Sequence, residues 1–192
     1  MQERNSIVIT GTPGVGKTTA SKLMADQYGF KLIELNRLAK EIGVSEKDEE
    51  RDSWVINPRR IRAALRKILT DGATGFLIEG HFADLVPEMF VKKAIVLRTN
   101  PIVLQERLRQ RGYSEEKIKE NVEAELVDSC LISAIEAFGE ERVVEADTTE
   151  LEANTLVNVL RDIIDGKNGM PPGSINWMVK LEAEGKLQQL LH

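Results

Sequence analysis

Residues 11–18 read Gly-Thr-Pro-Gly-Val-Gly-Lys-Thr and fit the pattern G-x-x-x-x-G-K-[ST]. An apolar run at 7–10 precedes this stretch and predicts a buried strand, whereas residues 18–28 carry apolar side chains at helical spacing. Glycines allow a loop to curl with its backbone N–H groups turned inward, where they and the helix N-terminus form a nest for an anion. A chance match arises in roughly one chain of this length in a hundred. The stretch therefore predicts a phosphate-binding loop between a strand and a helix.

Two side chains of this loop indicate what it binds. In such loops the lysine, here Lys17, reaches the β- and γ-phosphates of a nucleoside triphosphate, and the hydroxyl of Thr18 is a ligand for Mg²⁺. The late strands end in Arg-Thr-Asn-Pro at 98–101 and Glu-Ala-Asp-Thr at 145–148, and neither fits the Asn-Lys-x-Asp pattern that reads guanine. We therefore expect ATP, bound together with Mg²⁺.

Short apolar runs alternate with helical stretches along the chain. The expected strands are residues 7–10, 31–35, 75–79, 94–97 and 142–145. The expected helices are residues 18–28, 57–68, 100–112, 114–139 and 149–164, the last starting at a capping box, Thr-Glu-Leu-Glu. Strands separated by helices are joined by right-handed crossovers and run parallel. The pattern predicts a three-layer α/β domain around a parallel five-stranded sheet.

The composition excludes several classes of protein. A chain of 192 residues with 42% hydrophobic and 30% charged residues is an ordinary globular domain. One cysteine, Cys130, permits no internal disulfide and no cysteine-rich metal site, and its place among apolar positions predicts a packed side chain. There is no apolar run of about 18 residues and no signal-peptide pattern, so we expect a cytoplasmic protein.

The net charge of −5 conceals two strongly basic segments. Residues 92–111 carry six basic residues and one acid, and residues 58–67 carry five basic residues and no acid, so each has a net charge of +5. Arg107 and Arg111 are four residues apart and share one helix face, from which an arginine can stabilise a phosphoryl group in transfer. A solvated helix face is the alternative, and we expect it for Arg109, beside Glu106.

A carboxylate ends the third expected strand, and an imidazole follows two residues later. Glu79 ends that strand, close to the phosphate-binding loop in a doubly wound sheet, where it could bind Mg²⁺ through water or position the attacking group. His81 lies two residues later and is a candidate catalytic group, with a structural hydrogen bond as the alternative. The sequence has no cluster of His and Cys residues, so we do not expect a metal site made of protein ligands alone.

Four stretches together resemble the atypical, nuclear-type adenylate kinases and their archaeal relatives. They are GTPGVGKTT at 11–19, Glu-x-His at 79–81, LRTNPIVLQERLRQRGYSEEKI at 97–118 and NVEAE at 121–125. The resemblance spans about residues 6–165, and Arg-Gly-Tyr at 111–113 is its most specific part. It implies a P-loop nucleoside-monophosphate-kinase-like fold and phosphoryl transfer from MgATP to AMP. It further implies ATPase activity and a role in maturation of the small ribosomal subunit.

The same resemblance implies roles for individual residues. It implies that ATP is bound by Gly14, Val15, Gly16, Lys17, Thr18 and Thr19. A short lid at about 110–120 would bring Arg111 over the phosphates, and an arm at about 34–57 would hold AMP through Asn36 and Lys40, with Arg107 also on the substrate. Lys40 stands where some relatives carry Arg, and Glu79 where eukaryotic members usually carry Asp.

Residues 1–165 form the expected kinase core, and residues 166–192 a linker and a helical tail. The tail's apolar residues favour a helix docked on the core over a helix that binds a partner. The acidic run at 46–50 suits a basic ribosomal-protein tail, or is a solvated loop, and contact with pre-rRNA is a further expectation from the resemblance. Two other functions stay open: an ATP-driven ribosome-assembly switch with only side kinase activity, and a kinase of a small non-nucleotide metabolite.

Overall fold

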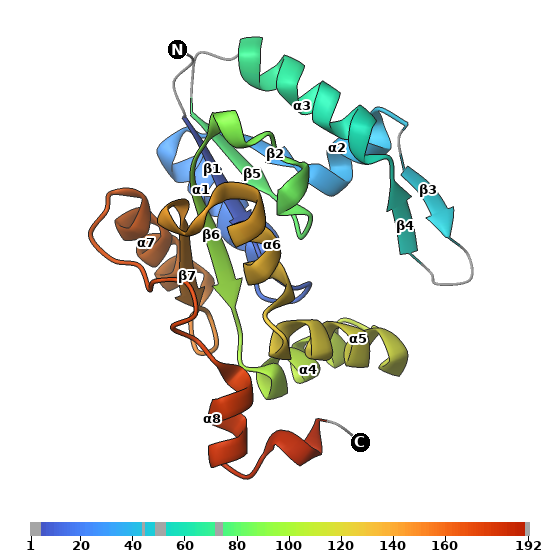
Figure 1. The fold of residues 1–192 in the computed structure, drawn as a ribbon, viewed down its shortest axis with the longest axis vertical. Helices are drawn as coiled ribbons and strands as arrows, with labels where there is room; N and C mark the ends of the chain where they lie inside the picture. The colour runs from blue at the N-terminus through green and yellow to red at the C-terminus, as the bar shows by residue number, and fades with distance from the viewer. Residues whose placement is uncertain (1–4, 44, 49–52, 72–74, 191–192) are drawn as a thin grey trace.

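The computed structural model describes residues 5–43, 45–48, 53–71 and 75–190. Five strands form a parallel sheet in the order β2-β5-β1-β6-β7 (Figure 1). Their bounds are Ser6–Thr10 (β1), Lys31–Glu34 (β2), Phe76–Glu79 (β5), Val91–Arg98 (β6) and Val143–Asp147 (β7). The expected strands coincide with these within three residues at each end. The prediction of a parallel five-stranded sheet is therefore confirmed.

Helices cover both faces of this sheet, giving three layers (Figure 1). Their bounds are Lys17–Tyr28 (α1), Leu35–Glu41 (α2), Pro58–Asp71 (α3), Pro101–Gln110 (α4), Glu115–Leu126 (α5), Ser129–Phe138 (α6), Ala153–Ile164 (α7) and Trp177–Ala183 (α8). Strand side chains alternate between the faces: Ile7 and Ile9 of β1 pack in the cluster that holds α1 and α7, whereas Val8 packs in the cluster that holds α3 and α6. The central strands are buried on both sides, which explains the apolar runs 7–9 in β1, 76–78 in β5 and 94–97 in β6.

The region expected to form the arm, residues 34–57, contains a helix and two strands that the sequence did not predict. Helix α2 follows β2 directly, so Leu35 begins a helix instead of ending a strand. Strands β3 (Ser45–Asp48) and β4 (Ser53–Ile56) then form an antiparallel hairpin apart from the main sheet (Figure 1). The last two residues of the acidic run at 46–50 lie outside the described residues.

One predicted helix is in fact two. Residues 114–139 form α5 and α6, because Asp128 between them adopts a left-handed conformation with φ 57°. The carboxylate of Asp128 pairs with the guanidinium of Arg98 from β6. The i,i+4 apolar spacing continues through the break and therefore concealed it. As a result Cys130 lies near the start of α6 and not in the middle of a helix.

The start of α7 also differs from the prediction. The helix begins at Ala153, four residues after the expected capping residue Thr149. The Thr149 hydroxyl instead donates a hydrogen bond to Asp147 and accepts one from the backbone N–H of Asn100 at 2.9 Å. Its side chain therefore ties the ends of two strands together and does not cap a helix.

The C-terminal segment packs on the core, as the docked arrangement predicts. Met170 forms an antiparallel bridge with Glu145 of the edge strand β7. Beyond it, Ile175, Trp177, Leu181 and Leu190 are buried in the same hydrophobic cluster as β1 and α1. No helix within the described ranges is long and apolar enough to cross a membrane.

Candidate nucleotide-binding site

The loop between β1 and α1 has a backbone that only glycine accommodates. Gly11 and Gly14 have φ values of 137° and 100°. A Cβ atom on Gly11 would lie 2.4 Å from the carbonyl oxygen of Leu97, and one on Gly14 would lie 2.7 Å from a methyl group of Leu104. The loop is therefore pressed against β6 and α4, and helix α1 starts directly after it at Lys17. This is the strand–loop–helix arrangement that cradles phosphates.

The ammonium group of Lys17 lies within this loop. It donates hydrogen bonds to the carbonyl oxygens of Gly11 at 2.7 Å and Thr12 at 3.1 Å. Burial lowers the pKa of Lys17, whereas the carboxylates of Glu79 and Glu125 act in the opposite direction. A buried cation whose hydrogen bonds, among the described residues, go to carbonyl oxygens of its own loop is well placed to bind phosphate oxygens.

Glu79 lies beside the first turn of α1, as expected. Its carboxylate oxygens accept a hydrogen bond from the hydroxyl of Thr18 at 3.3 and 3.4 Å. Burial raises the pKa of Glu79, and Lys17 acts against this shift. No group of three or more His, Cys, Asp or Glu residues suited to a metal occurs in the described part of the chain. A hydroxyl and one carboxylate fit a Mg²⁺ ion that takes its remaining ligands from phosphate and water.

Two cavities, each of about 250 Å³, are lined in part by the phosphate-binding loop. The first is lined by Lys17, Thr18, Asn36, Glu79, His81, Arg111 and Tyr113, among others. The second is lined by Val15, Ala20, Arg107, Arg111, Thr148, Leu151 and Leu156, among others. The walls shared by both are Gly14, Gly16, Thr19 and Arg111. Two compartments therefore meet over one anion-binding loop.

His81 forms part of the first cavity wall and packs on Phe82, with the ring centroids 3.7 Å apart. Burial lowers the pKa of His81 from 6.5 to about 4, and the charge of Lys17 adds to this shift. The imidazole is therefore neutral at pH 7. It can donate or accept one hydrogen bond at the site, but it does not supply positive charge.

Three of the four arginines in the basic segment 92–111 lie on α4 or directly after it, and their environments differ. Arg111 follows α4 and lines both cavities. Arg107 donates to the carbonyl oxygens of Thr148 at 3.0 Å and Thr149 at 2.9 Å, and it lines only the second cavity. Arg109 is exposed and pairs with Glu106 at 3.4 Å and with Glu115 at 3.4 Å, which is the solvated face expected for it.

The residues expected to hold the acceptor are therefore not all together. Asn36 lines the first cavity, whereas Arg107 lies in the second. Lys40 is exposed one turn further along α2 and lines neither cavity. Residues 14–19, which the resemblance implies bind ATP, form the end of the loop and the first turn of α1. Val15 is buried, and its carbonyl oxygen accepts a hydrogen bond from the hydroxyl of Thr148 at 3.0 Å.

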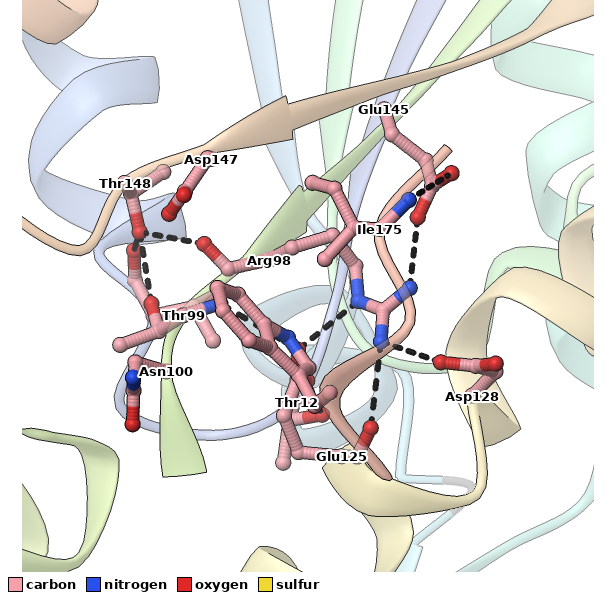
Figure 2. Close-up of polar contacts among 12 residues, drawn as sticks. Thr12, Arg98, Thr99, Asn100, Glu125, Asp128, Glu145, Asp147, Thr148 and Ile175 are labelled. Atoms are coloured by element: carbon pink, nitrogen blue, oxygen red, sulfur yellow. Dashed lines mark hydrogen bonds and ion pairs between the residues drawn. The ribbon is translucent and has the colours of Figure 1, made fainter. Parts of the chain in front are cut away.

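The structure contains a buried polar network next to the loop that was not predicted from the sequence (Figure 2). Glu125 of α5 accepts a hydrogen bond from the hydroxyl of Thr12 at 2.5 Å and another from Arg98 at 2.8 Å. One signal was available: Glu125 is three residues after Val122 and next to Leu126, so it interrupts the buried face of α5. A carboxylate at a core position requires partners, and here one partner is the phosphate-binding loop itself.

Similarity to known proteins identifies the family of this chain. A family model described as an AAA domain matches residues 7–128. The protein named "Putative adenylate kinase" of Methanocaldococcus jannaschii is 37% identical over 91% of this chain and 93% of its own length. Its namesake in Pyrococcus abyssi is 40% identical over 89% and 90%, respectively. The chain belongs to this adenylate kinase family. The expected resemblance to archaeal adenylate kinases is thereby confirmed.

Solved structures share the fold of this family member. Shikimate kinase from Acinetobacter baumannii, in complex with shikimate, matches with a TM-score of 0.60 at 16% identity, over 87% of this chain and 96% of its own. Shikimate kinase from Bacteroides thetaiotaomicron matches with a TM-score of 0.56 at 20% identity, over 83% and 98%. The adenylate kinase family member therefore has the architecture of a small P-loop kinase.

Proposed function

We propose that this protein transfers the γ-phosphoryl group of MgATP to AMP and forms two molecules of ADP. The observation that carries the proposal is the pair of cavities that meet over one phosphate-binding loop. A kinase that joins two nucleotides needs two nucleoside compartments whose phosphate ends converge. A simple nucleotide hydrolase needs only one.

The second cavity suits the nucleoside of ATP. Leu151 and Leu156 provide an apolar wall. Arg107, in the last turn of α4, is held by the backbone carbonyls of Thr148 and Thr149. The planar guanidinium offers a face on which a nucleobase can stack. From there the triphosphate runs over the backbone N–H groups of the loop to Lys17.

The first cavity suits AMP, with its phosphate directed at Lys17 and Arg111. In the reaction an AMP phosphate oxygen attacks the γ-phosphorus, and the bond from that phosphorus to the oxygen shared with the β-phosphate breaks. AMP becomes ADP, and the remainder of ATP leaves as ADP. The attacking oxygen is already an anion, so no strong general base is required. This is consistent with a neutral His81 that orients but does not accept a proton.

Charge stabilisation is the main work assigned to the protein. Lys17 and Arg111 face the position of the transferred group from the loop and from the turn after α4. Mg²⁺, when bound through Thr18 and through water on Glu79, supplies further positive charge at the β- and γ-phosphates. The segment 110–120 acts as a lid and the segment 34–57 as the acceptor arm, which together exclude water from the site.

One assay tests this function against the alternatives. The protein is incubated with MgATP alone, with AMP, or with shikimate or gluconate, and all nucleotide products are quantified. AMP-dependent formation of two ADP per ATP supports the proposal. ADP and phosphate that form equally fast without AMP indicate an ATPase, as an assembly switch for the small ribosomal subunit requires. Transfer to shikimate or gluconate indicates a metabolite kinase.

A matched pair of lysine variants locates the activity. Lys17→Ala removes the buried cation of the loop and is expected to abolish both transfer and hydrolysis. Lys92→Ala removes an exposed lysine from β6, outside both cavities, and is expected to leave both activities unchanged. Full activity of Lys17→Ala would place the active site elsewhere.

A further inference from the structure

The carboxylate of Glu125 is a junction between three parts of the chain. It is 2% exposed, and four donors surround it. One oxygen accepts hydrogen bonds from Arg98 Nε at 2.8 Å, the indole N–H of Trp177 at 3.1 Å and the backbone N–H of Thr99 at 3.2 Å. The other oxygen accepts from the Thr12 hydroxyl at 2.5 Å. Figure 2 shows Thr12 and Arg98 converging on this carboxylate.

Thr12 connects this junction to the active site. Its backbone carbonyl oxygen accepts a hydrogen bond from the ammonium group of Lys17 at 3.1 Å. Three consecutive hydrogen bonds therefore run from the indole of Trp177 through Glu125 and Thr12 to Lys17. We call these four residues the tail-to-loop relay. The relay is buried throughout, since all four residues are less than one tenth exposed.

The segment that carries Trp177 is held firmly at its start. The backbone of Met170 exchanges hydrogen bonds with that of Glu145, at 2.8 and 3.2 Å. One carboxylate oxygen of Glu145 accepts from the backbone N–H of Ser174 at 2.9 Å, and the other accepts from Arg98 at 2.6 Å. The same guanidinium thus supports both the tail and Glu125.

Charge counting explains why neutral donors matter here. Arg98 is a single cation that pairs with three carboxylates, those of Glu125, Glu145 and Asp128. The surplus negative charge is buried on Glu125 and Glu145, so it needs the hydrogen bonds of uncharged groups. Trp177 and Thr12 supply two of the four that Glu125 receives. Removing the indole N–H therefore weakens the fixed position of the carboxylate that holds the loop.

We propose that Trp177 and Glu125 are positioning residues for the phosphate-binding loop, so that the C-terminal segment sets the affinity of the site for ATP. The inference rests on the proposed function only in requiring that ATP bind this loop. It assigns residues 170–190 a role at the site in addition to their packing on the core, although α8 itself lies outside the three layers of the domain (Figure 1).

A double-variant cycle on the full chain tests the relay through ATP affinity. Trp177→Phe keeps an aromatic ring and removes the N–H, and Thr12→Val keeps the bulk and removes the hydroxyl. Each single variant is expected to weaken MgATP binding by about five- to tenfold in calorimetric titration, which is the loss of about one hydrogen bond. The double variant is expected to bind no more weakly than the weaker single variant, because both changes break the same relay.

Leu181→Ala is the matched control for packing. It removes a buried side chain from the same helix without removing a relay hydrogen bond. Its effect on ATP affinity is expected to multiply with that of Thr12→Val, while its melting temperature falls further than that of Trp177→Phe. Multiplicative behaviour of Trp177→Phe with Thr12→Val, or unchanged affinity in Trp177→Phe, would overturn the inference. Failure of the unaltered protein to bind MgATP would instead overturn the proposed function.

A spectroscopic measurement decides the matter even if Trp177→Phe does not fold. The chain has two tryptophans, so Trp54→Phe leaves Trp177 as the sole indole emitter. Saturation with MgATP is expected to change the intensity or the emission maximum of Trp177, because Lys17 exchanges its carbonyl partner on Thr12 for phosphate. Thr12→Val in this background is expected to abolish the change. Emission that stays constant as MgATP saturates the site would contradict the relay.

Discussion

The guanidinium of Arg98, at the end of β6, donates a hydrogen bond at 2.6 Å to the carboxylate of Glu145 on the neighbouring strand β7. The two residues pair between adjacent strands of the sheet, and both side chains are buried. The flanking carboxylates of Glu125 and Asp128 raise the pKa of Arg98, although burial acts against them. A permanently charged group therefore lies at the centre of the polar network in Figure 2.

Replacing Arg98 tests the energetic role of this network. Arg98→Met leaves two buried carboxylates without their cation, so we expect the free energy of unfolding to fall by about 3–5 kcal/mol. Arg62→Met is the control, because Arg62 forms an exposed pair with Asp84 and its loss should cost at most about 1 kcal/mol. Urea denaturation measures both. A loss below about 1 kcal/mol for Arg98→Met would contradict this assignment.

Gly14 tests the close packing of the phosphate-binding loop. In Gly14→Ala the new Cβ would lie 2.7 Å from Leu104 in a backbone with φ 100°, so we expect a loss of about 1–3 kcal/mol of stability and weaker ATP binding. Gly75→Ala is the control, because its Cβ would meet Phe30 at an ordinary 3.4 Å. Calorimetric titration with MgATP and thermal unfolding compare the two. Tight ATP binding by Gly14→Ala would show that the loop has room to relax.

The two cavities predict opposite kinetic effects for two substitutions. Arg107→Met changes only the second cavity and is expected to raise KM for ATP by about tenfold with little effect on KM for AMP. Asn36→Ala changes only the first cavity and is expected to raise KM for AMP and not for ATP. Initial rates with each nucleotide varied in turn measure the split. The reverse pattern would exchange the donor and acceptor compartments.

His81 predicts a specific loss of stability in acid. Burial lowers its pKa from 6.5 to about 4, so between these pH values the unfolded chain binds a proton that the folded chain refuses. Titration of His81 therefore leaves the free energy of unfolding unchanged above about pH 6.5 and lowers it as the pH drops towards 4. Between pH 7 and pH 4.5 the loss is about 2 kcal/mol.

His81→Gln removes the titrating group and is expected to show a smaller loss of stability over the same interval. Denaturation curves at pH 7 and pH 4.5 for both proteins give the difference, and the fall shared by the two reports the titration of other groups. Identical pH dependence in the two proteins would mean that the imidazole titrates normally.

The sequence predicted the features that depend on local patterns. Apolar runs such as 76–78 identify strands because both faces of the central sheet are buried, and the glycines of the loop identify a backbone that other residues cannot adopt. The break at Asp128 was missed because it results from a pairing with Arg98, thirty residues away in the chain. Apolar spacing carries no information about such a partner.

The same limit applies to the candidate site. The spacing of Arg107 and Arg111 predicts a shared helix face. In the structure both line the second cavity, whereas only Arg111 of the two lines the first, and spacing alone could not predict this difference. The contact of Thr12 with Glu125 spans 113 residues and depends on how α5 packs against the loop. Glu125 at a core position indicated that a partner exists, but only the three-dimensional arrangement identifies it.

The position of Trp177 in the chain has a consequence for biosynthesis. Every strand of the main sheet, the phosphate-binding loop and α5 leave the ribosome before residues 170–190 do. During that interval the carboxylate of Glu125 lacks its indole partner and that of Glu145 lacks Ser174. The nascent protein therefore completes its sheet first and the surroundings of its loop last, and translation that stops before Ser174 leaves the carboxylates of Glu125 and Glu145 each without one of their hydrogen-bond donors.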